Sequence, residues 1–270
     1  MSGGVDSSVS AYLIKQEGYE TVGITLKLFA NEDIGDLNAK TCCSLKDVED
    51  AKNVSFKLGM KHYVLNFTEQ FKEDVILRFV DGYAKGFTPN PCIDCNRFIK
   101  FDRLLKKAEE MEFDYIVTGH YAVIEYDEPA QRFLLKKSVD EKKDQSYVLY
   151  TLTQHQLSKT LLPLGKMRKS KIRTIALQQD FVNAKKHDSQ DICFVRDGNY
   201  SEFIERYTGK KYQPGNFIDI NGNVIGQHQG IINYTIGQRK GLGLNYHKRF
   251  FVCDKNIKEN TVVLGNSENL

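Results

Sequence analysis

A cluster of glycine and serine residues near the start of the chain has the composition of a phosphate-binding loop. Gly3 and Gly4 allow the backbone to approach an anion closely, and serine hydroxyls on both sides add hydrogen-bond donors. A helix that begins near Ser7 would direct the positive end of its dipole to the same place. Because this stretch lacks the lysine of a P-loop, we expect it to hold a pyrophosphate through backbone amides. Asp6 is then a candidate magnesium contact, and a flexible terminus is the alternative interpretation.

Two cysteines in CxxC spacing, Cys92 and Cys95, directly precede a predicted helix. A helix N-terminus beside Arg97 and Lys100 favours the thiolate form, so we expect one of the two, Cys95 above all, to be a nucleophile. A CxxC pair is also half of a zinc site. The sequence has no second CxxC or CxxH to complete four ligands, so no structural zinc is expected.

A third cysteine, Cys193, lies between two large apolar residues. This context fits a reactive thiol and an inert buried thiol equally well. Cys42, Cys43 and Cys253 are interpreted as structural. Six cysteines in 270 residues are too few for a disulfide scaffold, and in a reducing compartment a close pair more often binds metal or takes part in catalysis.

Composition predicts a globular protein of about two domains, with 41% hydrophobic residues in a chain of 270. The sequence has no apolar run near the ~20 residues that span a bilayer and no secretory leader, so we expect a cytoplasmic protein without a membrane partner.

The net charge of +3 is small, but the stretch between Thr160 and His187 is strongly basic. It is either a solvated helix face or a phosphate-binding surface, and its basic residues are Lys166, Arg168, Lys169, Lys171, Arg173, Lys185 and Lys186.

Periodicity predicts strands that alternate with helices over the first part of the chain. The expected helices cover residues 9–16, 47–58, 68–84 and 98–111, with Thr68 as a cap, and the expected strands cover 21–29, 62–67 and 115–117. This alternation is typical of an α/β fold with a parallel sheet that binds ligands at the carboxyl ends of its strands. A basic helical segment follows from about Lys159. After Pro214 the pattern changes to short strands, with a tight turn at Asn221 and Gly222.

Six motifs carry a resemblance to a known family. In chain order they are SGGVDSS, NPCIDCN, TGHY, KDQSYVLY, DSQDICF and YTIGQRKGLG, and together they make the chain similar to the tRNA-specific 2-thiouridylases, called MnmA or TrmU. The resemblance implies a Rossmann-like PP-loop ATP pyrophosphatase domain of the adenine nucleotide alpha hydrolase type over residues 1–158, to which residues 188–198 return. It also implies a small helical, tRNA-binding central domain over 159–214 and a partial β-barrel over 215–270.

The resemblance also implies a reaction. ATP adenylates the C2 oxygen of the wobble uridine, and a persulfide on Cys193 supplies the sulfur that replaces this oxygen. Cys95 matches the partner nucleophile that releases the sulfur or closes a disulfide with Cys193. The implied cofactors are ATP and Mg²⁺, and the implied partners are tRNA and a sulfur-relay protein or cysteine desulfurase.

Family positions suggest two groups of binding residues. Those expected to contact ATP are Met1, Ser2, Gly3, Gly4, Val5, Asp6, Ser7, Ser8, Leu26 and Gly119. Those expected near the extruded base or the tRNA are Asn90, Pro91, Cys92, His120, Lys143, Asp144 and Gln145. With tRNA as substrate, the basic segment from Lys166 to Lys186 is favoured as a surface for the RNA backbone.

Two departures from the family pattern leave alternatives open. Many members carry an acid where this chain has Cys92. The carboxylate that would assist the reaction at that position is therefore absent here, or Asp94 takes its place. The additional thiol permits an iron-sulfur cluster held by Cys92, Cys95 and Cys193. Members of the family also place a strand directly before the SGGVDS loop and continue beyond Gly265. We therefore expect a chain that lacks both ends, for which a non-catalytic RNA-binding fragment is one alternative and an amide-forming ATP pyrophosphatase another.

Overall fold

The computed structural model describes residues 1–29, 45–188, 191–195, 198–244 and 250–270. The chain folds into two compact units. The first consists of Met1–Val75 and Cys92–Phe194, and the second of Ile76–Pro91 and Val195–Leu270. The fold thus groups residues 159–194 with the N-terminal residues, whereas the sequence suggested a separate segment over 159–214. The division into domains over 1–158, 159–214 and 215–270 remains a prediction.

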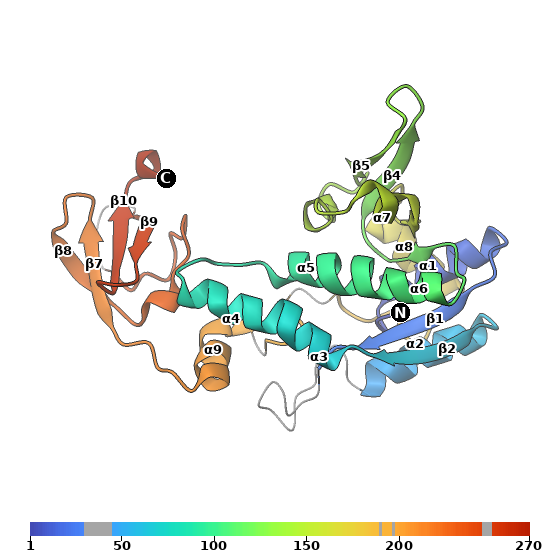
Figure 1. Ribbon diagram of the computed structural model, residues 1–270, viewed down its shortest axis with the longest axis horizontal. Coiled ribbons are helices and arrows are strands. Elements are labelled where there is room, and N and C mark those ends of the chain that lie inside the picture. Colours follow the sequence, from blue (N-terminus) through green and yellow to red (C-terminus); the bar gives the residue numbers. More distant parts are fainter. Residues whose placement is uncertain (30–44, 189–190, 196–197, 245–249) are drawn as a thin grey trace. The chain divides into compact units, whose positions relative to one another are not determined.

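The first unit begins with the expected alternation of helices and strands (Figure 1). Helix α1 (Val5–Gln16) leads to strand β1 (Val22–Lys27), and helix α2 (Leu45–Lys57) leads to strand β2 (Lys61–Asn66). The two strands pair in parallel. Gly18, with φ of +91°, lies in the turn after α1, where a left-handed residue is needed to redirect the chain.

A long helical stretch carries the CxxC pair. It consists of α5 (Pro91–Asp94), a π-helical segment η2 (Cys95–Leu104) and α6 (Leu105–Glu110). Strand β3 (Ile116–Val117) follows and pairs in parallel with β6 (Thr160–Leu161). The helix expected over 98–111 is therefore confirmed and starts earlier.

The helix expected after β2 is present, but Thr68 is not its cap. Helix α3 (Thr68–Phe71) has Phe67 in the N-cap position and passes into a π-helical turn, η1 (Lys72–Ile76). Asn66 Oδ1 accepts a hydrogen bond from the Thr68 backbone N–H at 3.1 Å. The prediction was wrong because the capping oxygen comes from two residues upstream.

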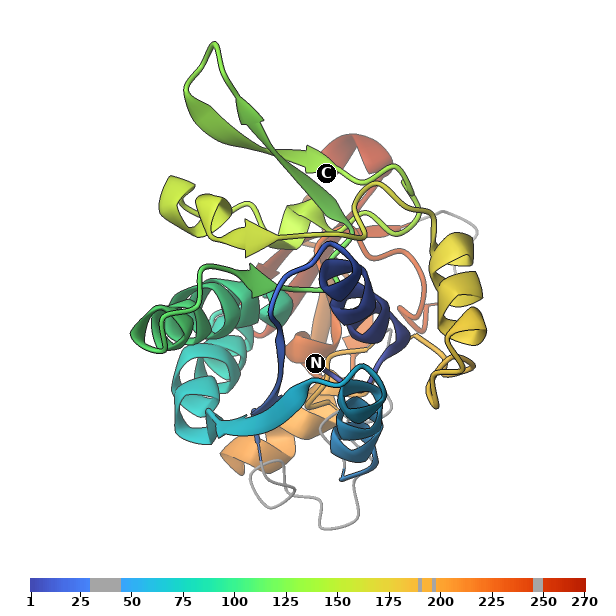
Figure 2. The same ribbon diagram turned by 90° about the vertical axis from the view of Figure 1, so that its right-hand side faces the viewer.

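An antiparallel hairpin that we did not expect follows β3. It consists of β4 (Ala122–Asp127) and β5 (Arg132–Lys137), and it projects beyond the helices of the first unit (Figure 2). The chain returns through a short 3₁₀ helix (Ser146–Val148) and α7 (Gln154–Ser158), and α8 (Lys169–Gln178) follows after β6.

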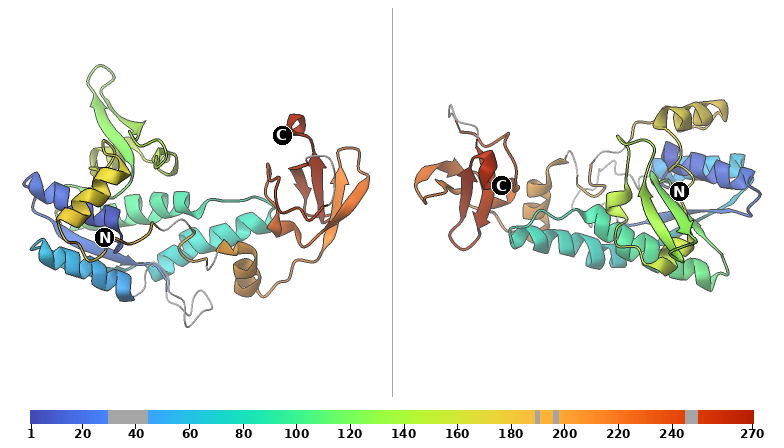
Figure 3. Two further views of the ribbon diagram at one scale, coloured as in Figure 1. Left: turned by 180° about the vertical axis from the view of Figure 1, so that it is seen from behind. Right: turned by 90° about the horizontal axis from the view of Figure 1, so that it is seen from above.

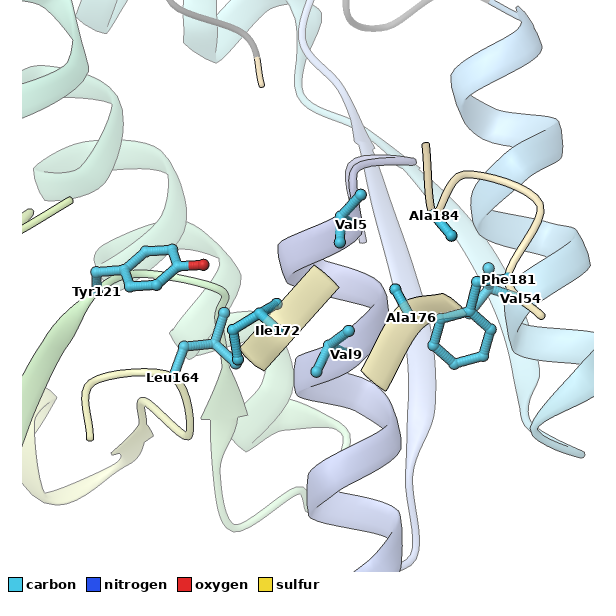
Figure 4. Close-up of a cluster of buried hydrophobic side chains, with 9 residues drawn as sticks. All are labelled: Val5, Val9, Val54, Tyr121, Leu164, Ile172, Ala176, Phe181 and Ala184. Atoms are coloured by element: carbon cyan, nitrogen blue, oxygen red, sulfur yellow. The ribbon is translucent and has the colours of Figure 1, made fainter. Parts of the chain in front are cut away.

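Helix α1 lies between α2 and α8 in the main core of the first unit (Figure 4). Val5 and Val9 of α1 pack with Val54 of α2 and with Ile172 and Ala176 of α8, and all five side chains are buried. Each buried Val or Ile side chain contributes about 1.5–3 kcal/mol when it is fully removed from water. The first turn of α1, and the loop before it, are thereby held on two sides.

The second unit combines helices with a mixed sheet, shown in orange and red in Figures 1 and 3. Rings of α4 (Leu77–Ala84) pack on α9 (Tyr200–Thr208), and Tyr83 stacks on Tyr200 at 5.1 Å. The sheet has the order β8-β7-β10-β9. Its strands are β7 (Gly215–Asp219), β8 (Val224–His228), β9 (Phe251–Asn256) and β10 (Thr261–Gly265).

The sheet confirms the expectation of strands after Pro214. The turn between β7 and β8 contains Asn221 and Gly222, as expected, and Gly222 alone of the two has a positive φ, +87°. Short 3₁₀ helices over Ile231–Asn233 and Ser267–Asn269 complete this unit. Within the described parts of the chain, no helix is both long and apolar enough to cross a membrane.

Candidate functional site

The glycine and serine loop precedes α1 directly, and this confirms a helix start next to it. Gly3 adopts φ of +71°, and Gly4 is the N-cap residue with φ −91° and ψ 163°. The Ser2 backbone N–H donates to Ser7 Oγ at 3.2 Å. The first N–H groups of a helix have no intrahelical acceptors, so the loop presents a set of amides suited to an anion.

Two loop residues have side chains that face the core. Val5 belongs to the hydrophobic cluster around α1. Ser8 is fully buried, donates to the Gly4 carbonyl at 3.0 Å and accepts from Asn183 Nδ2 at 2.9 Å. These side chains support the loop from within, so a ligand would reach these positions through the backbone.

The Asp6 carboxylate is bound to a lysine that sequence reasoning did not connect with the loop. Lys169 Nζ lies 2.7 and 2.8 Å from the two Asp6 carboxylate oxygens, and the Tyr121 hydroxyl donates to Oδ1 at 2.7 Å. Lys169 is 8% exposed. Burial, then the hydrogen bond to Asp6, raise the pKa of Tyr121 far above its usual value, so this hydroxyl stays a donor. No spacing signal in the sequence relates Lys169 to the loop, because 163 positions separate it from Asp6.

Asp188, in the motif that carries Cys193, forms ion pairs with three cationic side chains. Lys143 Nζ lies at 2.7 Å, and Lys169 Nζ and the Arg173 guanidinium each lie at 2.8 Å from its carboxylate. Burial alone would raise the pKa of Asp188, but the hydrogen bonds from Lys143 and Lys169 lower it to about 2. Lys169 therefore bridges the loop residue Asp6 and the cysteine motif through one buried ammonium group.

The basic segment, which we expect to meet the RNA backbone, has an inner face whose cations are paired with acids and an exposed outer face. On the inner face, Lys169 and Arg173 bind Asp188, and Lys186 binds Asp47 and Asp50. Burial opposes the charge of Lys186, but these two carboxylates raise its pKa. The outer face consists of the exposed residues Lys166, Arg168, Lys171 and Lys185.

Lys143, Asp144 and Gln145 lie in the segment that joins the β4–β5 hairpin to the rest of the unit. Asp144 Oδ1 accepts from the Ser138 N–H at 2.7 Å. Gln145 Oε1 accepts from the Tyr121 N–H at 3.0 Å, and the Gln145 N–H donates to the Tyr121 carbonyl at 2.8 Å. Through Tyr121, this segment is connected to Asp6.

Gly119 approaches the loop closely. A Cβ at this position would lie 3.0 Å from Asp6 C and 3.0 Å from Ser7 N, so a larger residue would displace the first turn of α1. The neighbouring His120 is buried, and Thr118 Oγ1 lies 2.8 Å from its Nδ1. Burial, and then the nearby Lys100 ammonium, lower the pKa of His120 well below its usual value, so the imidazole is neutral at pH 7.

Cys95 and Cys193 both belong to the first unit. Cys95 is buried at the start of η2, and Cys193 is half-buried in a turn. Helix α3 contacts η2, and Phe71 of α3 packs edge-on against Phe194 at 5.7 Å. One short helix thus touches both the helix that bears Cys95 and the turn that bears Cys193.

The remaining predicted residues are more dispersed. Cys92 is exposed on the turn before Cys95, and Leu26 lies in β1 opposite Leu65 of β2. Asn90 and Pro91 belong to the second unit, so the structure does not relate them to the loop. Cys253 lies in β9, where burial raises the pKa of its thiol, and Cys42 and Cys43 lie outside the described residues.

A metal site is not evident from the donors that the structure describes. Among them, no group of three or more His, Cys, Asp or Glu side chains is arranged to hold a metal ion. Both Asp6 oxygens face the Lys169 ammonium group, so the expected magnesium contact does not fit the observed arrangement.

Comparisons with known proteins identify relatives over both units. Residues 1–197 match the family described as the tRNA methyl transferase HUP domain, and residues 201–266 match the tRNA methyl transferase PRC-barrel domain. The HUP match agrees with the expected PP-loop fold, and the PRC-barrel match agrees with the expected β-rich end.

Two relatives are similar over nearly the whole chain. The tRNA-specific 2-thiouridylase MnmA of Clostridioides difficile is 53% identical over 270 residues, which cover 100% of this chain and 74% of that protein. The tRNA-specific 2-thiouridylase MnmA of Acetivibrio thermocellus is 51% identical over 266 residues, which cover 98% of this chain and 74% of that protein. Among solved structures, an NMN synthetase from Francisella tularensis aligns with a TM-score of 0.46 at 17% identity, over 78% of this chain and 76% of that one.

Proposed function

The chain belongs to the tRNA-specific 2-thiouridylase family, and on that premise we propose how its residues carry out the reaction. The protein is a sulfurtransferase that forms 2-thiouridine in tRNA, with ATP as the activating substrate. The observation that carries the residue assignments is the bridge from the loop residue Asp6 through Lys169 to Asp188 of the cysteine motif.

The loop before α1 binds the pyrophosphate part of ATP. Backbone amides at the helix start and the Ser2 hydroxyl are the donors, and the Ser7 hydroxyl joins them when it turns from the Gly4 carbonyl, to which it donates at 3.1 Å. Leu26 and Gly119 lie against the rest of the nucleotide. The Lys169 ammonium group adds positive charge beside the phosphates. Because Asp6 is bound to Lys169, we assign Mg²⁺ to the phosphates of the incoming ATP rather than to a protein side chain.

Sulfur transfer follows activation of the base. The O2 oxygen of the uridine attacks the α-phosphorus of ATP and displaces pyrophosphate. The terminal sulfur of a Cys193 persulfide then attacks C2, and AMP leaves with the oxygen. The Cys95 thiolate attacks Sγ of Cys193, which releases 2-thiouridine and leaves a Cys95–Cys193 disulfide. An external dithiol reduces this disulfide, and a sulfur-relay protein or cysteine desulfurase in the cytoplasm reloads Cys193.

The tRNA contacts are assigned to two regions. The outer face of the basic segment, Lys166, Arg168, Lys171 and Lys185, meets the RNA backbone, since exposed cations release counterions when they bind phosphates. Residues at the family's base-binding positions, Asn90, Pro91 and Cys92, meet the extruded uridine, and the segment of Lys143 to Gln145 supports the surface beside it.

Serine variants of the cysteines test the sulfur route. Replacing Cys193 or Cys95 with Ser should lower 2-thiouridine formation by at least about 10³-fold, because the nucleophile is lost. Cys253→Ser, in β9, is the matched control and should keep full activity. The measurement is nucleoside mass spectrometry of unmodified tRNA incubated with ATP and a sulfur donor.

The alternatives predict other results in the same assay. If Cys92→Ser loses as much activity as Cys95→Ser and Cys193→Ser, and if anaerobically purified protein contains iron, the iron-sulfur cluster would be favoured. An ATP-dependent amide product that survives Cys193→Ser would favour an amide-forming enzyme. Binding of tRNA without any thiolation by the wild type would favour the non-catalytic fragment.

A further inference from the structure

The carbonyl of Gly3 has two side-chain donors that none of the site assignments above uses. Asn183 Nδ2 donates to the Gly3 oxygen at 2.9 Å, and Lys186 Nζ donates to the same oxygen at 3.1 Å. Both donors come from the segment after α8, about 180 positions further along the chain. A carbonyl in the middle of a phosphate loop is thus fixed from outside the loop.

The orientation of this carbonyl decides the orientation of an amide. Gly3 C=O and Gly4 N–H belong to one trans peptide unit, and in such a unit the two groups point in opposite directions. Donors that hold the oxygen on one side therefore direct the Gly4 N–H to the other side. If the peptide turned over, a partially negative oxygen would replace the N–H donor at the anion site.

The sequence makes this peptide easy to turn over. It lies between two glycines, which adopt positive and negative φ with similar ease, and Gly3 already has φ of +71°. A loop that needs glycines to approach an anion has little steric preference of its own for the correct peptide orientation. The preference must come from hydrogen bonds.

Both donors are themselves held in place. Asn183 is 2% exposed and also donates to Ser8 Oγ at 2.9 Å, while its Oδ1 has no hydrogen-bond partner among the described residues. A buried oxygen without a hydrogen-bond partner costs free energy, so the orientation of this amide group is set by its two donated hydrogen bonds to the loop. Lys186 Nζ donates to the Asp47 carboxylate and to Asp50 Oδ2, the latter at 2.9 Å. The Asp47 backbone also lies directly beside the loop, because a Cβ on Gly3 would be 2.3 Å from the Asp47 carbonyl oxygen.

We propose that Asn183 and Lys186 are positioning residues for ATP, which hold the Gly3–Gly4 peptide so that the Gly4 N–H faces the phosphates. Lys186 also neutralises the negative end of the peptide dipole. The inference rests on the proposed binding of ATP at this loop and adds two residues outside the loop to its machinery.

Two variants separate positioning from general support. Asn183→Asp keeps the size of the side chain but replaces the donor with an acceptor, and Lys186→Met keeps its length but removes the charge. Each should raise the Kd for ATP about 5- to 10-fold, the factor expected for one lost hydrogen bond of ordinary strength. The KM for ATP should rise in parallel, while kcat at saturating ATP and the KM for tRNA stay within about 3-fold of the wild type. Lys186→Arg should restore most of the affinity.

The matched controls lie on α2. Asn53→Asp and Lys46→Met change the same residue types at exposed positions and should leave ATP binding unchanged. Calorimetric titration with ATP and steady-state kinetics on tRNA are the measurements. Should Asn183→Asp fail to fold, Lys186→Met decides the question.

Wild-type affinity for ATP in Lys186→Met, or equal increases in the KM for ATP and for tRNA, would overturn the inference. A wild-type protein that shows no ATP binding at all would instead overturn the proposed function on which the inference rests.

Discussion

The inner and outer faces of the basic segment have the same composition and opposite environments. Lys169 and Arg173 of α8 face inward and bind Asp188, whereas Lys171, on the same helix, is exposed. Lys169 is largely removed from water, at 11% side-chain exposure, and Arg173 is half-buried, at 33%. A cluster of basic residues in a sequence can therefore serve two purposes, which only the fold separates.

The difference has a physical consequence for each face. Charges that are buried with their partners interact through a low effective dielectric, and removing one partner leaves an uncompensated charge. Exposed charges are screened by salt and contribute little to folding, so they remain available for a polyanion. The inner face should thus govern stability and the ATP site, and the outer face should govern tRNA affinity.

The largest effect is expected at the centre of the inner face. Lys169→Met should lower the free energy of unfolding by about 3–5 kcal/mol, because Asp6 and Asp188 both lose their shared cation. Urea denaturation followed by circular dichroism measures this change. Lys171→Met, two positions along α8, is the control and should stay within about 0.5 kcal/mol of the wild type. Equal stability of the two variants would remove the distinction between the faces.

A combined variant of the outer face should affect tRNA alone. With Lys166, Arg168, Lys171 and Lys185 all changed to Ala, we expect the Kd for tRNA at physiological salt to rise roughly 10- to 100-fold, with a shallower salt dependence. The Kd for ATP should not change. Filter binding at several salt concentrations measures the tRNA affinity, and a Lys106→Ala, Lys107→Ala double variant on α6 is the control. An unchanged salt dependence would place the RNA elsewhere.

The smallest effect concerns pH and sharpens the description of the inner face. Because the folded pKa of Asp188 is about 2, below its unfolded value, this residue stabilises the fold above pH 4. That contribution should decline as the pH falls from 4 to 2. Asp188→Asn should be less stable at pH 7 and show a flatter dependence in this range. Parallel curves for the two proteins, from urea denaturation at each pH, would mean that Asp188 is not held by its cations.

The sequence predicted elements whose signals are local. Helix α2 shows its apolar face in the spacing of Ala51 and Val54 and ends before Gly59, so it was expected at nearly the observed bounds. The β4–β5 hairpin was missed because its strands do not alternate cleanly between buried and exposed residues. Tyr126 and Phe133 contact each other across the hairpin at 5.0 Å, yet Tyr126 is 39% exposed.

The site was predictable as far as its motifs are contiguous. The loop and the close approach of Gly119 follow from short patterns, and the structure places them together. Lys169 and Asn183 contribute through single side chains that lie more than 160 positions from the loop residues they bind. No spacing rule relates such residues, because packing of α8 and the segment after it against α1 brings them there. Sequence reasoning also failed at short range, at the start of α3. There the side-chain oxygen of Asn66, and not that of Thr68, accepts the hydrogen bond from a backbone N–H of the first helical turn.

A labelled-sulfur experiment tests the central claim most directly. The protein would be loaded with ³⁴S persulfide, freed of excess donor, and mixed with ATP and unmodified tRNA for a single turnover. We expect peptide mass spectrometry to find the label on Cys193 beforehand, and nucleoside mass spectrometry to find it in 2-thiouridine only when ATP is present. Label that remains on Cys193 after ATP and tRNA are added, with no labelled 2-thiouridine formed, would contradict transfer through this residue.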